Sequence, residues 1–358
     1  MDVRKLNRGL IELAVSQGIR EIRQDPKRGV RRLSDLGEHF AGRWFSDNIF
    51  VQIHEILKRE DSKYFKLIQN LLDYVDEETI KCFGINLGYN SWTCGVSRMR
   101  QQQEETKETD ASKAQENEKV RETAKAQAAE SIQETAGVQD AVKTQTDMMV
   151  REVPAERTCR KISWLCELSY DSGDGDPAEK LNQLSEEINL GRQKGVYAYA
   201  LYPRETFAQN PELVFLLDRH PDCAFLWFFR EPNLTEPQLN VLQKHNNCLY
   251  LFPALKEDGT PDTEIARKMR EHKILYAYYH IYGETENGLN DQLEKLQPVM
   301  AEEPSVLIMK AAPGVSDAYR KKFAREIWDN RKNPAYDTFL IELTEDSRAI
   351  DDMIAGIR

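Results

Sequence analysis

Residues 196–252 read VYAYALYPRETFAQNPELVFLLDRHPDCAFLWFFREPNLTEPQLNVLQKHNNCLYLF. Three short runs rich in aliphatic and aromatic residues, at 196–202, 224–229 and 248–252, alternate with longer stretches that mix apolar and charged residues. Short apolar runs are typical of buried strands, and the longer stretches have the apolar spacing of helices. Strands joined by intervening helices run parallel, so this stretch predicts part of a parallel sheet.

The same alternation extends in both directions along the second half of the chain. We expect strands at 162–168, 196–202, 224–229, 248–252, 274–282, 305–309 and 338–343, with helices at 178–193, 210–220, 236–245, 263–272, 289–300 and 316–330. Six or seven strand–helix units are fewer than the eight of a closed TIM barrel. The expected fold class is therefore α/β with a partial TIM-like barrel, and a doubly wound open sheet is the alternative.

The region before this alternation is predicted to be helical. Leucines and isoleucines recur at helical spacing through most of residues 1–80. The sequence Phe83–Gly95, FGINLGYNSWTCG, breaks that pattern with three glycines and two asparagines among aromatic residues, which predicts a shaped turn. This turn is either a binding loop or a structural connector packed on the barrel.

Residues 101–158 have a different composition from the rest of the chain. They are rich in Gln, Glu, Lys, Ala and Thr and contain neither leucine nor aromatic residues. Such a segment buries too little apolar surface to offset the entropy of ordering, which predicts a linker or insertion. The expected domains are a helical region over 1–100, a low-complexity linker or insertion over 101–158, and the barrel over 159–358.

The overall composition excludes several classes of protein. The 358 residues are 40% hydrophobic and carry a net charge of −11, which disfavours nucleic acid as a partner. No run of 18 apolar residues is present, so no membrane span is expected. The six cysteines form no C-x-x-C pair, which favours reduced thiols in a cytoplasmic protein.

Polar side chains at the ends of the predicted strands are the candidates for function, because ligands bind at the carboxyl ends of parallel strands. Glu205, His280 and Lys310 could together supply an acid, a base and a positive charge. The alternative is that strand ends are polar because they are exposed, and that His280 is a hydrogen-bonded core histidine. The other strand-end residues are Tyr170, Asp171, Arg204, Arg230, Glu231, Tyr282 and Glu342.

Five segments of the barrel region share features of one family: 162–164 (ISW), 191–199 (GRQKGVYAY), 217–228 (LDRHPDCAFLWF), 338–343 (TFLIEL) and 354–358 (IAGIR). They resemble segments of bacterial radical S-adenosylmethionine (SAM) proteins, and the N-terminal helices with the motif at 83–92 resemble the part that precedes such barrels. The resemblance implies a (β/α)6-type partial barrel. It also implies a [4Fe–4S] cluster and SAM as cofactors.

The residues that would bind these cofactors are changed. Radical SAM chemistry needs three cysteine thiolates on one short loop, and the segment after the first strand, 169–177 (SYDSGDGDP), has no cysteine. The family's Gly-Gly-Glu-Pro turn, which contacts the SAM amino group, is replaced by Pro203-Arg204-Glu205-Thr206, in which Glu205 alone matches. Proline and arginine prevent the close backbone approach that glycines allow. We therefore predict neither cofactor.

Asp171, Asp174 and Asp176 in the same loop are hard oxygen donors of the kind that bind calcium. The EF-hand pattern fails, because no glutamate stands at the closing position. A solvated turn is the simpler interpretation, and no metal site is predicted.

These observations favour a radical SAM-like protein without the cluster motif, acting as a non-catalytic binding or scaffolding partner of a peptide or of a catalytic homologue. The alternative is an enzyme that uses the barrel mouth. It would carry out cluster-free acid/base chemistry, or a radical SAM reaction with cluster ligands placed elsewhere.

Overall fold

The structure is a computed structural model of the chain. It describes residues 3–41, 55–57, 59, 62–106, 112, 163–171, 173, 175–231, 233–256 and 258–356. One compact unit comprises residues 1–99 and 163–358, and residues 100–162 form a second unit. Most of the predicted insertion over 101–158 lies outside the described residues; 101–106 and 112 are helical.

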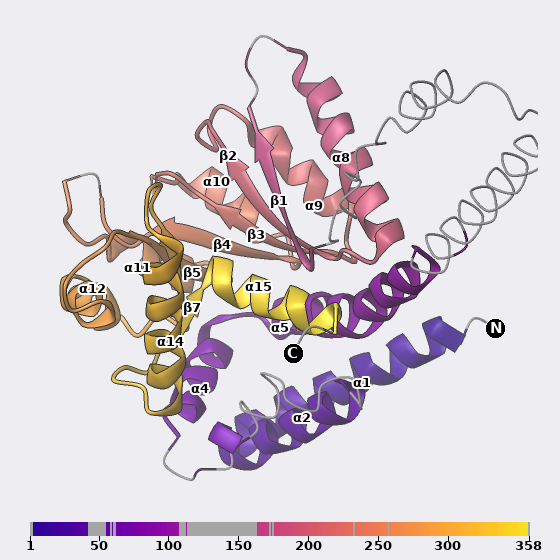
Figure 1. The fold of residues 1–358 in the computed structure, drawn as a ribbon, viewed down its shortest axis with the longest axis horizontal. Helices are drawn as coiled ribbons and strands as arrows, with labels where there is room; N and C mark the ends of the chain where they lie inside the picture. Colours follow the sequence, from indigo (N-terminus) through magenta and orange to yellow (C-terminus); the bar gives the residue numbers. More distant parts are fainter. Residues whose placement is uncertain are drawn as a thin grey trace, which may run out of the picture. The chain divides into compact units, whose positions relative to one another are not determined.

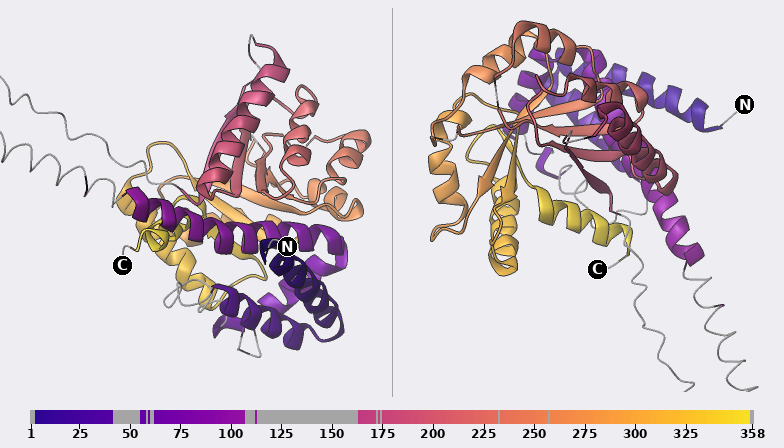
Figure 2. Two further views of the ribbon diagram at one scale, coloured as in Figure 1. Left: turned by 90° about the vertical axis from the view of Figure 1, so that its right-hand side faces the viewer. Right: turned by 90° about the horizontal axis from the view of Figure 1, so that it is seen from above.

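The core of the larger unit is a single sheet whose seven strands follow one another in chain order, and every neighbouring pair is parallel. The views in Figures 1 and 2 show that this sheet is curled. The predicted partial α/β barrel is confirmed, with one strand more than a six-unit barrel has. The strands are β1 (Leu165–Tyr170), β2 (Ala198–Pro203), β3 (Ala224–Phe228), β4 (Cys248–Pro253), β5 (Tyr276–Tyr282), β6 (Val306–Ala311) and β7 (Phe339–Glu342).

Helices connect successive strands and pack on the convex side of the sheet (Figure 1). They are α8 (Pro177–Lys194), the 3₁₀ turn η3 (Pro211–Val214) with α9 (Phe215–Arg219), α10 (Glu236–Leu242), α11 (Glu264–Glu271), α12 (Leu289–Lys295), α13 (Gln297–Met300) and α14 (Asp317–Lys332). The bounds of α8 follow from its sequence: Asp176 caps it by accepting a hydrogen bond from the Ala178 amide, and Gly195 ends it at φ 98°.

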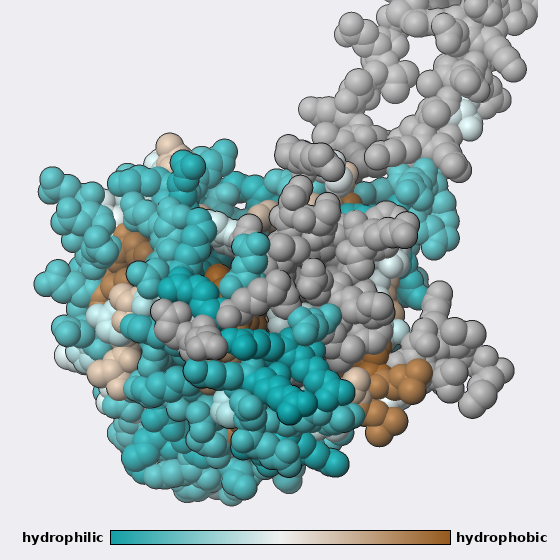
Figure 3. Space-filling model, turned by 90° about the horizontal axis from the view of Figure 1, so that it is seen from below, coloured by the Kyte–Doolittle hydropathy of each residue, from teal (hydrophilic) through white to brown (hydrophobic). Residues whose placement is uncertain are grey.

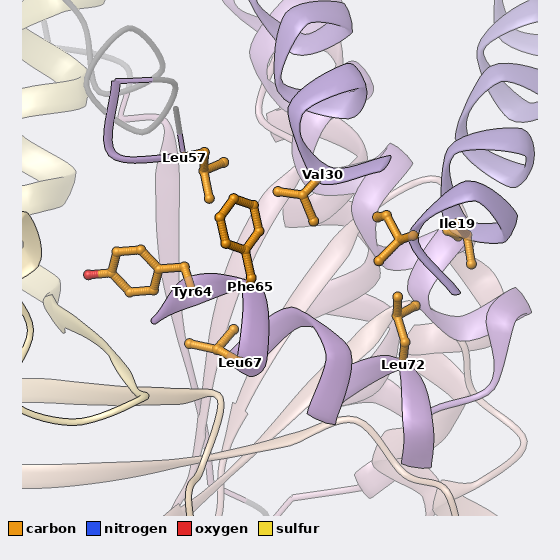
Figure 4. Packing of buried hydrophobic residues seen from close by; sticks show 8 residues of the cluster. Ile19, Val30, Leu57, Tyr64, Phe65, Leu67 and Leu72 are labelled. Atoms are coloured by element: carbon orange, nitrogen blue, oxygen red, sulfur yellow. The ribbon is translucent and has the colours of Figure 1, made fainter. Parts of the chain in front are cut away.

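The region before the insertion is helical, as predicted. Its helices are α1 (Val3–Gln24), α2 (Pro26–Ala41), α4 (Tyr64–Tyr74) and α5 (Glu77–Gly84). Figure 4 shows their apolar side chains packed together, among them Ile19, Val30, Phe65 and Leu72. Tyr64 joins this cluster to the barrel, because its hydroxyl donates to the Arg331 carbonyl at 3.0 Å and its ring lies 5.6 Å from that of Phe339.

The turn predicted over Phe83–Gly95 is wrong. The chain continues from α5 into a π-helix, η2 (Ile85–Gly95). The wider π-helical turn suits asparagines that bind outside their own helix: Asn86 donates to the carbonyls of Pro221 and Cys223 at 2.8 and 2.9 Å, and Asn90 donates to that of Asp222 at 2.8 Å. The segment is therefore a connector that packs on the barrel.

Two glycines permit this packing. A β-carbon on Gly95 would lie 2.3 Å from the Gly195 carbonyl oxygen, and one on Gly195 would lie 2.5 Å from the Gly95 oxygen. Any side chain at either position would force the end of η2 away from the end of α8. Gly95, one of the glycines that suggested a turn, is thus required for a contact with Gly195, which lies 100 residues further along the sequence.

The last helix, α15 (Leu343–Ile354), starts directly after β7, with the Glu342 carboxylate accepting from the Glu345 amide at its N-terminus. It reaches the start of β1, where Asp351 accepts hydrogen bonds from the Ser163 hydroxyl at 2.8 Å and the Trp164 amide at 2.6 Å. Figure 1 shows α15 running from β7 toward this point. The two edge strands are thereby linked, although they do not pair with each other.

Within the described residues, no helix is both long enough and apolar enough to cross a membrane. Figure 3 shows that the face on the side of α1 and α2 is mainly hydrophilic, with hydrophobic atoms at its margins.

We predict that Asp351→Ala lowers the free energy of unfolding by about 1–2 kcal/mol, because two hydrogen bonds to a partly exposed charged group are lost. Urea denaturation of the purified variant measures this change. Asp329→Ala is the control, since it removes a carboxylate that is 64% exposed and paired with Lys332, and should cost less than about 0.5 kcal/mol. Equal losses in the two variants would contradict a linking role for Asp351.

Candidate functional site

The concave face of the sheet carries a cluster of polar and aromatic side chains near the carboxyl ends of the strands. Side chains alternate between the two faces of a strand, so residues aligned across parallel strands share a face. Ser169 aligns with Tyr202, and Ile281 aligns with Lys310. Glu167 is two residues before Ser169, so it faces the same side.

Lys310 crosses this concave face. Its Nζ lies 3.7 Å from the centroid of the Tyr202 ring and 5.8 Å from that of Phe228. It also lies 4.0 Å from Oε1 of Glu167. A side chain from β6 thus reaches β1 and β2, and the ammonium rests on an aromatic face, where the ring quadrupole attracts it.

The aromatic rings beneath Lys310 form a continuous floor. Tyr202 stacks on Phe228 with 4.5 Å between centroids, and Phe228 meets Tyr279 edge-on at 5.2 Å. The Tyr279 hydroxyl donates to the Phe229 carbonyl at 2.9 Å. Burial raises the pKa of both tyrosines, so both phenols stay protonated at neutral pH.

The electrostatic balance at Lys310 follows from this setting. Its side chain is 30% exposed, against 58% for Glu167. Burial lowers the pKa of the Lys310 ammonium, and the neighbouring Glu167 carboxylate opposes that effect. The Tyr202 hydroxyl makes a long hydrogen bond of 3.5 Å to Oε1 of Glu167. Lys310, Glu167 and Tyr202 therefore form one interacting group.

The structure does not bring the three predicted site residues together. Lys310 lies in the barrel mouth. His280 aligns with Met309, so it faces the convex side, where its Nε2 is 2.9 Å from Oε1 of Gln292 in α12. Burial lowers the pKa of His280, so it stays neutral at neutral pH. Glu205 follows β2 and accepts a hydrogen bond of 3.1 Å from Asn210.

Glu205 lines a small cavity between the segments that follow β2 and β3. The cavity measures about 100 Å³, and Phe207, Asn210, Arg230 and Glu231 also line it. Sites for drug-sized ligands occupy about 300–1,000 Å³, so this cavity fits a small group such as one side chain.

The residues that the structure describes do not form a ligand set for the family's cluster. Among the described residues, no three His, Cys, Asp or Glu side chains are grouped so that they could hold a metal ion. Two of the loop aspartates have structural partners: Asp171 pairs with Arg204 at 2.8 Å, and Asp176 caps α8. Asp174 lies outside the described residues.

Neither the family models, nor the curated proteins, nor the solved structures with which the chain was compared give a match. The curled, all-parallel sheet fits a radical SAM-like partial barrel, but this architecture does not identify a family.

Sequence reasoning missed Glu167 and Tyr202. Glu167 lies within the predicted strand 162–168 and Tyr202 ends the predicted strand 196–202, so both were interpreted as strand residues alone. The available signal was the alternation within the first run, where one carboxylate interrupts LCELSY at an inward position.

Glu342, another strand-end residue, has a structural role. It is fully buried, and the Tyr282 hydroxyl donates to its Oε1 at 2.8 Å. Burial raises the pKa of Glu342 above its usual range. The folded protein therefore holds this proton more tightly than the unfolded chain. The resulting stabilisation is complete below the unfolded pKa of about 4.3 and is lost as the pH rises through the folded value.

We predict that the free energy of unfolding of Glu342→Gln rises relative to wild type between about pH 4 and pH 8, because glutamine does not titrate. Urea denaturation at a series of pH values measures the difference. Tyr282→Phe removes the donor to the Glu342 carboxylate, which raises the pKa of Glu342 further. The free energy of unfolding of this variant should therefore fall more over the same pH range than that of the wild type. A difference that stays constant with pH would contradict a raised pKa of the buried Glu342.

Proposed function

We propose that the chain is a radical SAM-like half-barrel without the family's cluster, and that it acts as a non-catalytic binding partner. The observation that carries this proposal is the occupation of the barrel mouth by Lys310 and the rings of Tyr202, Phe228 and Tyr279. These side chains cover the strands of the concave face with an aromatic surface, whereas the family's cofactors need cysteine thiolates and glycine backbone there.

The distribution of the other candidate residues supports the same proposal. Acid/base catalysis needs its groups within hydrogen-bond reach of one substrate. His280 and Lys310 lie on opposite faces of the sheet, and Glu205 is engaged by Asn210. The enzyme alternative based on these three residues would need a rearrangement of the sheet itself.

The rim of the mouth offers a surface for a partner. Ile281 aligns with Lys310 on the concave face and is 54% exposed. An exposed apolar side chain beside charged groups suits recognition of a peptide or of a catalytic homologue, in which one apolar anchor is surrounded by polar contacts.

We expect no iron–sulfur cluster after anaerobic reconstitution with iron and sulfide. Clusters held by thiolates absorb near about 400 nm, so absorbance, with iron and sulfide quantification and a SAM titration, gives the result. A stoichiometric cluster would show that dispersed cysteines such as Cys94, Cys159 and Cys166 supply the ligands, and would overturn the proposal.

The binding surface is tested with a displayed peptide library selected on the wild-type protein. The selected peptides should bind Ile281→Glu at least about tenfold more weakly, because a charge replaces the apolar anchor. Leu190→Glu on α8 is the matched control, since Leu190 is 55% exposed and lies outside the mouth, and it should bind as wild type does. Failure to select peptides, or equal effects of both variants, would contradict a binding site at the mouth.

A further inference from the structure

The side chains of Lys310, Glu167 and Tyr202 form a group that could be chemically reactive, and the proposed binding of a partner does not require this reactivity. The amine nitrogen of Lys310 and the Glu167 carboxylate are 4.0 Å apart, and the Tyr202 hydroxyl is 3.5 Å from the same carboxylate oxygen. The three side chains come from β6, β1 and β2, so strands of one rigid sheet fix their arrangement. Sites built on strands hold reacting groups more exactly than sites built on loops.

Lys310 differs in its surroundings from other lysines of the chain. Its side chain is 30% exposed, whereas those of Lys256 and Lys322 are 49% and 59% exposed. Lys81 and Lys268 are as little exposed, at 24% and 28%, but their ammonium groups pair with carboxylates that are 61% and 65% exposed, whereas that of Lys310 rests on an aromatic ring. Burial against Tyr202 and Phe228 lowers the pKa of Lys310, which increases the fraction of neutral amine. The neutral amine is the nucleophile, and a lysine desolvated in an apolar site is activated in this way.

We propose that Lys310 is a reactive lysine that forms a reversible imine with small aldehydes or ketones in the barrel mouth. The neutral amine adds to the carbonyl carbon and gives a carbinolamine. The carbon–oxygen bond then breaks, the carbonyl oxygen leaves as water with the two hydrogens of the amine, and a carbon–nitrogen double bond remains. No oxidant or reductant takes part, and hydrolysis by water reverses the step.

Glu167 and Tyr202 have defined roles in this step. The Glu167 carboxylate relays protons between the nitrogen and the departing oxygen, because it lies near the nitrogen and is exposed to solvent. The Tyr202 hydroxyl positions that carboxylate through its hydrogen bond. Proton relay is needed for loss of water, so Glu167 governs the rate of imine formation.

The walls of the mouth indicate the class of carbonyl compound. The amine rests on the rings of Tyr202 and Phe228, Tyr279 packs on Phe228, and Ile281 is the neighbour of Lys310 on the adjacent strand. This apolar setting favours a short aliphatic or aromatic carbonyl compound. The negative charge of Glu167 disfavours a carboxylate beside the carbonyl group. Uncharged aldehydes should therefore react better than α-keto acids.

The test uses the intact wild-type protein with propionaldehyde at neutral pH, followed by borohydride, which reduces the imine to a stable secondary amine. Peptide mass spectrometry then measures the rate of labelling at each lysine. We expect Lys310 to be labelled several-fold faster than Lys256 and Lys322, and pyruvate to label it more slowly than propionaldehyde does. Labelling at Lys310 no faster than at these exposed lysines would overturn the proposal.

Variants separate reactivity from simple access to solvent. Lys310→Arg should lose the adduct at this position and leave the labelling of Lys256 unchanged. Glu167→Gln keeps the size of the side chain and should slow labelling of Lys310 severalfold, with the circular dichroism spectrum unchanged. If Glu167→Gln labels Lys310 as fast as wild type does, the assigned proton relay is wrong. The result is independent of the peptide selection, since no partner is present.

Discussion

Seven parallel strands leave two unpaired edges, at β1 and at β7, and α15 joins them through the Asp351 carboxylate. Sheet edges need to be covered or connected, because their backbone groups otherwise remain open to other chains. Here the connection begins inside the sheet, where Glu342 caps α15 and binds Tyr282. The buried Arg331 guanidinium adds to this junction through the Leu340 carbonyl and the Asp346 carboxylate. Helix α15 thus connects the two edges of the half-barrel.

The curvature determines what the concave face can do. It brings β6 so close to β1 and β2 that one lysine side chain spans the gap and rests on Tyr202 and Phe228. The described part of the concave face is therefore a partly desolvated, aromatic surface that carries the Lys310 amine and the Glu167 carboxylate. The proposed peptide binding and the proposed imine formation both use this surface. It does not resemble the cysteine-rich mouth that a radical SAM reaction needs.

The N-terminal region shows how a local pattern can mislead. Glycine and asparagine in the segment 83–95 have strong turn preferences, yet the segment is helical throughout. Asn86 and Asn90 bind carbonyls of the loop before β3, and Gly95 allows close contact with Gly195. These residues have partners 100 or more positions away, which no window of local sequence contains. The adjacent helices with plain apolar periodicity, such as α4, were predicted correctly.

The sequence by itself determined the α/β class and the approximate position of each of the seven strands, and it favoured the partial barrel over the open sheet that the structure excludes. The apolar pattern of a strand is a local property, so each strand can be recognised from its own residues. It also determined that the three-cysteine loop is missing, because the order of the residues alone shows that 169–177 contains no cysteine. Only the tertiary structure decided which polar residues share a site. Strand register and the curl of the sheet decide on which face His280 lies, whether Lys310 reaches Glu167, and how much of Ile281 is exposed. Both arise from contacts between strands that are far apart in the chain.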